Sequence, residues 1–185
     1  MNHKIILASG SPRRKELLSL YTTDFTVCVS DFDESAVSTD TPAHLVEQLA
    51  RGKCLAVAKD HPGAVVIGCD TVVDVQGEVF GKPHSVEDAK RMLRALSGAA
   101  HEVHTGVCIS DGKRTESFVD SCRVTFFPLS EAEIDAYAAT KEPYDKAGAY
   151  AIQGRAALWL DAIEGDYYTI MGLPLSRTVR LLEQF

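Results

Sequence analysis

The sequence has no long apolar run. No stretch approaches the ~18 consecutive apolar residues that a membrane-spanning helix needs. The first residues, MNHK, lead directly into a short apolar strand and not into the longer apolar segment of a secretory signal. We therefore expect no signal peptide, no membrane partner and a soluble protein of the cytoplasm.

The sequence also lacks an excess of basic residues and any closely paired cysteines. It has 19 Lys and Arg against 26 Asp and Glu, a formal net charge of −7, which disfavours nucleic acid as a partner. The five cysteines are scattered and form no Cys-x-x-Cys pair. We expect them to be reduced, buried thiols, as is usual in the cytosol.

Several common catalytic and binding patterns are missing. There is no Gly-x-Ser-x-Gly elbow, and the aromatic pair in GDYY has no basic residues interleaved with it. His101 and His104 lie three apart in a predicted strand, so their side chains should face opposite sides and do not have zinc-protease spacing. The acidic loop DFDES, which contains Asp31, Asp33 and Glu34, offers oxygen ligands without the spacing of a calcium loop.

What is present is the pattern of one mixed α/β domain. The chain has 185 residues, of which 45% are hydrophobic and 24% charged, enough for a single large core. Apolar runs and turn residues predict strands at residues 5–8, 25–29, 64–75, 78–80, 101–110, 114–127, 149–153 and 157–163. Capping residues and helical spacing predict helices from residue 11, over 41–59, 85–98 and 130–139, and from 175. Hairpin turns are predicted at Gln76-Gly77 and Asp111-Gly112. Hairpins and helical crossovers together indicate a mixed sheet.

The stretch LASGSPRRKELL places small residues and two arginines where the first strand gives way to a helix. A helix N-terminus exposes backbone N–H groups at the positive end of the helix dipole, which suits a phosphate. Ser9 and Ser11 add hydroxyl donors, and Arg13 and Arg14 add forked hydrogen bonds to phosphate oxygens. The alternative is a capped first turn with two solvated arginines.

The strand VVIGCDTVV carries an aspartate, Asp70, among apolar residues. A carboxylate in such a place needs a partner, a metal ion or a position facing a cleft. Asp70 could therefore hold a divalent cation or activate a water molecule. The alternative is an aspartate that caps a turn at the end of the strand, in which case Thr71 merely fills a strand position.

Three lysines lie in loops or near the ends of elements: Lys53, Lys82 and Lys146. Each one alone is typical of a solvated surface residue. Lys82 is the most suggestive, because it is held between Gly81 and Pro83 directly after a strand.

Taken together, these stretches resemble the Maf family of nucleotide pyrophosphatases over nearly the whole chain. The resemblance rests on LASGSPRRKELL, DFDES, ARGKCLAVA, GCDTVV, GKPHSVEDAKRMLRALSGAAHEVHTGV, EPYDKAGAYAIQG and GDYYTIMGLPL in this order. It implies one domain over residues 1–185 that hydrolyses nucleoside triphosphates between the α and β phosphates, using a divalent metal cation such as Mg²⁺ or Mn²⁺. It also implies a mixed, strongly twisted sheet flanked by helices, with two lobes around a deep cleft, similar to the inosine triphosphate pyrophosphatases.

The resemblance also implies roles for individual residues. Substrate-binding positions match Ser9, Ser11, Arg13, Arg14, Thr71 and Gln153, and catalytic positions match Asp70, Lys82, Lys53 and Glu34, with Asp70 and Glu34 as metal ligands. The stretches DKAGAYAIQG and GDYY look like the branch that hydrolyses dTTP and UTP, where Arg13, Thr71 and Gln153 bear on substrate choice. Cys69 and Cys122 depart from the commoner alanine and threonine without touching a proposed role.

Two other functions are compatible with this pattern. The first is a nucleotide-binding regulator of cell division or septum formation, in which hydrolysis is secondary. The second is a phosphatase that releases orthophosphate. The expected partner in every case is a small-molecule nucleotide. Dimers occur in the family, although no apolar stripe in this sequence proves one.

Overall fold

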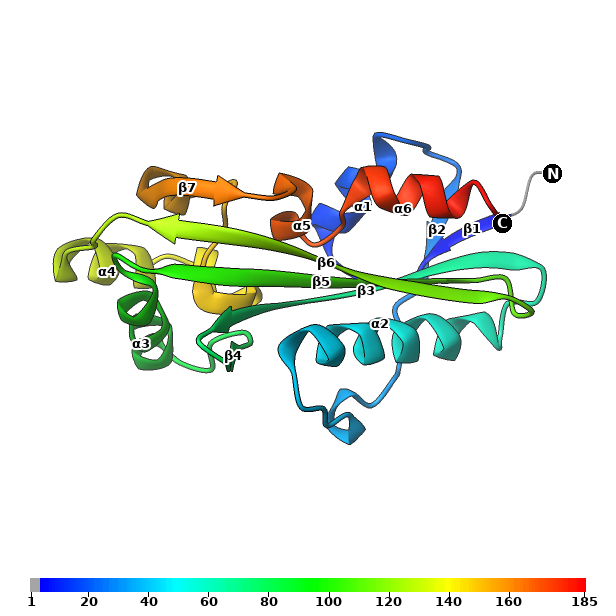
Figure 1. Ribbon diagram of the computed structural model, residues 1–185, viewed down its shortest axis with the longest axis horizontal. Helices are drawn as coiled ribbons and strands as arrows, with labels where there is room; N and C mark the ends of the chain where they lie inside the picture. Colours follow the sequence, from blue (N-terminus) through cyan, green and yellow to red (C-terminus); the bar gives the residue numbers. More distant parts are fainter. Residues whose placement is uncertain (1–3) are drawn as a thin grey trace. The chain divides into compact units, whose positions relative to one another are not determined.

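The computed structural model describes residues 4–185 (Figure 1). The strands are β1 (Lys4–Leu7), β2 (Phe25–Val27), β3 (Ala64–Val75), β4 (Glu78–Phe80), β5 (Ala100–Ser110), β6 (Thr115–Phe126) and β7 (Leu160–Glu164). The α-helices are α1 (Pro12–Ser19), α2 (Pro42–Ala58), α3 (Val86–Leu96), α4 (Glu131–Ala138), α5 (Tyr167–Met171) and α6 (Leu175–Leu182). Short 3₁₀ turns are η1 (Glu34–Ala36), η2 (Glu142–Asp145), η3 (Ala147–Ala149) and η4 (Arg155–Trp159).

The seven strands form one mixed sheet in the order β2-β1-β3-β5-β6-β7, with β4 paired to β3. Strand β1 runs parallel to both β2 and β3, whereas the β3–β4 and β6–β7 pairs are antiparallel. This confirms the predicted mixed α/β fold. The described residues form two compact units. The first contains residues 4–70, 105–120 and 172–185, and the second contains 71–104 and 121–171, so β3, β5 and β6 contribute to both.

In the first unit, α2 packs closely on the sheet because two strand residues have no side chain. A Cβ at Gly106 would lie 2.9 Å from Glu47 N and would overlap the Val46 carbonyl, and one at Gly68 would overlap the Ala50 carbonyl. Figure 1 shows α2 on one face of these strands and α1 and α6 on the other. The buried face of α2 is Val46, Leu49, Ala50, Cys54, Val57 and Ala58. Leu45 and Ala56 of the same helix are only half-buried.

In the second unit, local sequence signals are confirmed at most element ends. Gln76 and Gly77 have φ of 55° and 91°, the left-handed values that a tight hairpin requires. The Ser85 hydroxyl accepts a hydrogen bond from Asp88 N and caps α3. The Asp88 carboxylate accepts a hydrogen bond from His84 N, just before the cap residue. In α4, Ser130 and Glu133 form a capping box, in which the side chain of each accepts a hydrogen bond from the backbone N–H of the other.

The predicted strand at residues 149–153 is wrong, and the one at 157–163 is only partly right. Residues 149–152 are all buried, which explains the apolar pattern, but Gly148 and Ala149 have φ of 70° and 60° and turn the chain. The Tyr137 hydroxyl accepts a hydrogen bond from Ala151 N, which a neighbouring strand would otherwise receive. The turn η4 then precedes β7. An apolar run without alternation does not distinguish a strand from a buried turn.

All five cysteines are free, and all but the half-buried Cys28 are buried, as expected. Among residues 4–185, no helix combines the length and the apolar character needed to cross a bilayer.

The second unit contains a buried histidine, and its lowered pKa predicts a loss of stability in acid. His101 is 3% exposed, its Nε2 lies 2.8 Å from the Tyr150 hydroxyl, and burial lowers its pKa from 6.5 to about 4. As the pH falls, His101 therefore binds a proton at a higher pH in the unfolded chain than in the folded protein. The stabilisation present above pH 6.5 is consequently lost as pH falls toward 4. We expect this residue alone to cost about 3 kcal/mol over that window. Urea unfolding at several pH values measures the slope, which should be shallower in His101→Gln. Equal slopes for the two proteins would contradict the assignment.

Candidate active site

The predicted residues of the first unit follow the carboxyl ends of β1 and β2 or, in β3, the end of the stretch that pairs with β1. Leu7 of β1 pairs with Val27 of β2 and with Ile67 of β3. Ser9 follows β1 by two residues, the loop carrying Glu34 follows β2, and Asp70 lies three residues beyond Ile67 on β3. Open α/β sheets bind ligands at this end of their strands.

The turn between β1 and α1 is built around the hydroxyl of Ser9, which is 7% exposed. This oxygen accepts hydrogen bonds from Ser11 N at 3.3 Å and from Arg14 Nη1 at 3.0 Å. Arg14 Nε also donates to Gly172 O at 2.8 Å, so the guanidinium is fixed on two sides. Ser11 is the N-cap residue of α1, as predicted, but its side chain makes no capping hydrogen bond.

The first turn of α1 has arginines and no acidic residue. Positive side chains are repelled by the positive end of a helix dipole, and a bound anion relieves this repulsion. The turn is therefore suited to hold a phosphate group.

Asp70 is paired with a lysine that also reaches the acidic loop. Lys53 Nζ lies 2.6 Å from Asp70 Oδ1 and 3.0 Å from Glu34 Oε1. The side chains of Asp70 and Lys53 are 12% and 15% exposed, whereas that of Glu34 is 56% exposed. The ammonium compensates a carboxylate that would otherwise be costly to bury. The alternative, in which Asp70 only caps a turn, is not what the structure shows, because its partner is Lys53.

Helical spacing and one glycine bring Lys53 and Glu34 together. Lys53 follows the buried Leu49 by four residues, so it lies on the sheet-facing side of α2. A Cβ at Gly52 would overlap the ring of Phe32, which shows that this ring packs directly on the helix backbone. Phe32 thereby holds the loop that carries Glu34 beside Lys53. Glycine inside a helix costs about 1 kcal/mol in propensity, and this contact explains its presence.

The neighbouring thiol is not a competing nucleophile. Burial raises the pKa of Cys69 to about 11, so it is a neutral thiol at physiological pH. Within residues 4–185, no three His, Cys, Asp or Glu side chains form a cluster that could hold a metal ion. The acidic groups brought together are the pair Asp70 and Glu34.

The other predicted residues, Thr71, Lys82 and Gln153, belong to the second unit. Thr71 directly follows Asp70 on β3 and is half-buried, and Lys82 is exposed after β4. The carbonyl of Gly81 accepts a hydrogen bond from Gly148 N at 3.0 Å, which ties the segment before Lys82 to η3. Gln153 is exposed in the turn between η3 and η4.

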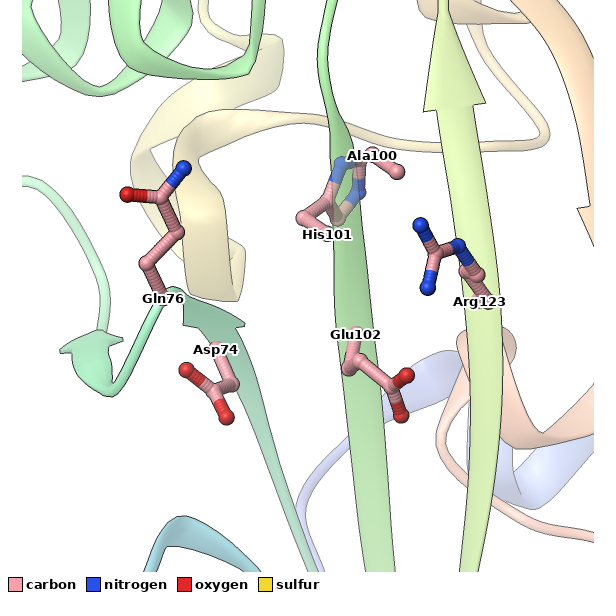
Figure 2. Close-up of a pocket in the computed structure, with 6 residues that line it drawn as sticks. All are labelled: Asp74, Gln76, Ala100, His101, Glu102 and Arg123. Atoms are coloured by element: carbon pink, nitrogen blue, oxygen red, sulfur yellow. The ribbon is translucent and has the colours of Figure 1, made fainter.

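The second unit also has a polar surface pocket of about 300 Å³ (Figure 2). Its lining residues are Asp74, Gln76, Ala100, His101, Glu102 and Arg123. None of the predicted site residues lines it, and we assign it no role in the chemistry.

Sequence reasoning missed the residues that support the site. Gly68 and Gly106 set the distance between α2 and the sheet, Phe32 anchors the acidic loop, and Gly172 O fixes Arg14. Isolated glycines inside strand patterns are the one signal that could have been used, because they mark close approach of another backbone.

Comparison with solved structures defines the class of fold. The chain is similar to the Staphylococcus aureus Ham1 protein, with a TM-score of 0.60, 16% identity and 98% of each chain covered. It is similar to a HAM1 protein from Coxiella burnetii, with a TM-score of 0.58, 14% identity and all of both chains covered. The protein thus has the mixed α/β fold of the Ham1 proteins.

Comparison of the sequence with known families and proteins identifies a narrower group than the fold does. The family model described as Maf-like protein matches residues 4–185. Relatives from Bacillus cytotoxicus and Bacillus mycoides, each named dTTP/UTP pyrophosphatase, are 50% identical over 182 residues, which are 98% of this chain and 95% of theirs. The chain belongs to the Maf family.

Proposed function

We propose that this protein is a nucleoside triphosphate pyrophosphatase that hydrolyses dTTP and UTP to the monophosphate and pyrophosphate. The relatives named for this activity are 50% identical along almost the whole chain. The observation that carries the proposal is the Lys53–Asp70 pair, at 2.6 Å, at the same end of the parallel strands as the Ser9–Arg14 turn. This arrangement puts the turn proposed to bind phosphate and the carboxylate proposed as the base at the same end of the strands.

In this proposal some residues neutralise the charge of the phosphates and others carry out or support the proton transfer. The backbone of the turn, Ser9, Ser11, Arg13 and Arg14 bind the phosphates, and preorganised donors of this kind stabilise charge that develops in the transition state. Asp70 accepts a proton from the attacking water, and Lys53 holds its carboxylate in place. Lys82 neutralises the pyrophosphate that leaves.

A divalent cation, Mg²⁺ or Mn²⁺, fits this donor set. Mg²⁺ commonly takes one or two protein carboxylates and completes its shell with water and substrate phosphate oxygens. Asp70 and Glu34, joined through one ammonium group, are such a pair of oxygen ligands. When bound, the cation would neutralise phosphate charge and polarise the phosphorus under attack.

Gln153 is proposed to read the base. Its amide offers one acceptor and a donor group, which match the N3–H and O4 of thymine and uracil. In Gln153→Ala we expect the preference for dTTP over dCTP to fall about tenfold, mainly through KM, because binding contacts remote from the phosphates are lost. Steady-state kinetics with both nucleotides measure this ratio. An unchanged ratio would show that the base is read elsewhere.

Pyrophosphate release from a panel of nucleoside triphosphates tests the proposal. We expect turnover of dTTP and UTP with Mg²⁺ or Mn²⁺, loss of turnover with a chelator, and pyrophosphate as the product. Orthophosphate would identify a phosphatase instead. Tight nucleotide binding with no turnover of any triphosphate would overturn the enzyme assignment and favour a nucleotide-binding regulator.

We also propose that the protein works in the cytoplasm on free nucleotides. The net charge of −7 and the five free cysteines support this, because strong acidity disfavours polyanion partners and free thiols persist in reducing compartments.

A further inference from the structure

The turn that carries Gln153 is held at both ends by one pair of side chains, Tyr137 and Glu142. The Tyr137 hydroxyl accepts a hydrogen bond from Ala151 N at 3.1 Å and donates one to Glu142 Oε1 at 2.9 Å. The same Oε1 accepts a hydrogen bond from Arg155 N at 3.0 Å. The backbone on both sides of Gln153 is thus fixed by one connected set of bonds.

Two features make this arrangement tight. Gly154 N donates to Ala151 O at 3.0 Å, which closes the turn itself. A Cβ at Gly154 would overlap the carboxylate of Glu142, so the carboxylate lies directly against the backbone next to Gln153. The φ of Gly154 is −101°, which other residues adopt, so the close approach and not the backbone conformation requires glycine here.

The pair is anchored in the core of the second unit. Tyr137 is 1% exposed, and its ring packs edge-to-face on Trp159 with 4.7 Å between the ring centroids. Lys146 Nζ donates to the backbone carbonyl of Glu142 at 2.9 Å, which fixes the residue from its other side. Burial raises the pKa of Tyr137, so its hydroxyl remains a donor at all physiological pH values.

We propose that Tyr137 and Glu142 are positioning residues that set base selectivity by fixing the turn around Gln153. This inference rests on the proposed function, because it takes Gln153 as the reader of the base. A side chain that must place a donor and an acceptor against one edge of a pyrimidine loses discrimination when its backbone moves by a fraction of an ångström. Tyr137 and Glu142 need no contact with the nucleotide to have this effect.

Three substitutions break the arrangement in different ways, and a fourth preserves it. Glu142→Ala removes the shared acceptor, Tyr137→Phe removes the hydroxyl while keeping the ring, and Gly154→Ala displaces the carboxylate. Glu142→Gln keeps a side-chain oxygen for both donors and is the matched control. For each variant we would measure kcat and KM for dTTP and dCTP, the Tm, and amide hydrogen exchange of residues 151–155.

We expect the three disruptive variants to lose dTTP-over-dCTP selectivity about tenfold through KM, with kcat for dTTP changed less than about threefold. Exchange at residues 151–155 should accelerate in all three, and Glu142→Gln should behave as wild type in both assays. Tyr137→Phe and Gly154→Ala still decide the question if Glu142→Ala unfolds.

Two outcomes would overturn the inference. One is wild-type selectivity in folded Tyr137→Phe and Gly154→Ala when Gln153→Ala has lost it. The other is unchanged exchange at residues 151–155 in the disruptive variants, which would show that the pair does not hold the turn whether or not the protein hydrolyses nucleotides. Failure of the proposed function has a different signature, since wild type would then release no pyrophosphate.

Discussion

Replacing Asp70 with asparagine is expected to slow pyrophosphate release from dTTP by about a thousandfold, the usual contribution of a positioned general base. The amide has nearly the shape of the carboxylate but cannot take up a proton, and it no longer neutralises the Lys53 ammonium, which lies 2.6 Å away in the native protein. The effect should fall on kcat more than on KM. Single-turnover kinetics with dTTP would separate the chemical step from binding.

Asp74→Asn is the matched control for this experiment. Asp74 lies four residues further along β3, and its Oδ1 accepts a hydrogen bond from Gly77 N that an asparagine oxygen can also accept. We expect activity within about twofold of wild type, because asparagine keeps an oxygen for Gly77 N and a polar group beside His104 Nε2, which lies 3.5 Å from Asp74 Oδ2. If Asp70→Asn retained more than a tenth of wild-type kcat, Asp70 could not be the base.

The second large effect is expected on the free energy of unfolding, when Gly106 is replaced with alanine. Gly106→Ala should destabilise the protein by about 3 kcal/mol, because the added Cβ meets backbone atoms of Val46 and Glu47 in α2 that cannot move independently of the helix. The helix must shift away from the sheet, and Lys53 shifts with it. We therefore expect a lower midpoint of urea unfolding together with a lower kcat.

Gly81→Ala provides the comparison for this experiment. Nothing lies within 4 Å of a Cβ built at Gly81, and its φ is not in the left-handed region. Alanine there should be neutral or stabilise slightly, by less than about 1 kcal/mol, through the unfolded state. Equal unfolding midpoints for Gly106→Ala and Gly81→Ala would contradict the close packing of α2.

The parts of this protein that sequence predicts well are those governed by neighbours in the chain. The hairpin at Gln76-Gly77 and the caps at Ser85 and Ser130 depend on a few consecutive residues, and each is found. The helix start at Ser11 is also found, although the Ser11 side chain makes no capping hydrogen bond and Ser11 N donates to the Ser9 hydroxyl.

The parts that could not be predicted depend on contacts between distant segments. Whether Asp70 would face a metal, water or a lysine was undecidable from its strand, because Lys53 is 17 residues away. The turn around Gln153 was predicted as a strand because its apolar residues are buried. The left-handed φ of Gly148 and Ala149 and the hydrogen bond from Ala151 N to the hydroxyl of Tyr137, 14 residues away, show why it is not one. The roles of Gly68, Gly106 and Gly52 depend on contacts that sequence does not show. The first two lie against the backbone of α2, and Gly52 lies against the ring of Phe32.

The hydrogen bond from Arg14 to Gly172 O joins residues 158 positions apart. Because Ser9, Arg14 and the first strand are synthesised before Gly172, the guanidinium cannot reach its final orientation until the chain has been made at least as far as residue 172. Contacts of such large separation close late and slow folding. A chain that stops before Gly172 would thus possess the strand, the helix and both arginines but would lack the contact that fixes Arg14 in the proposed phosphate site.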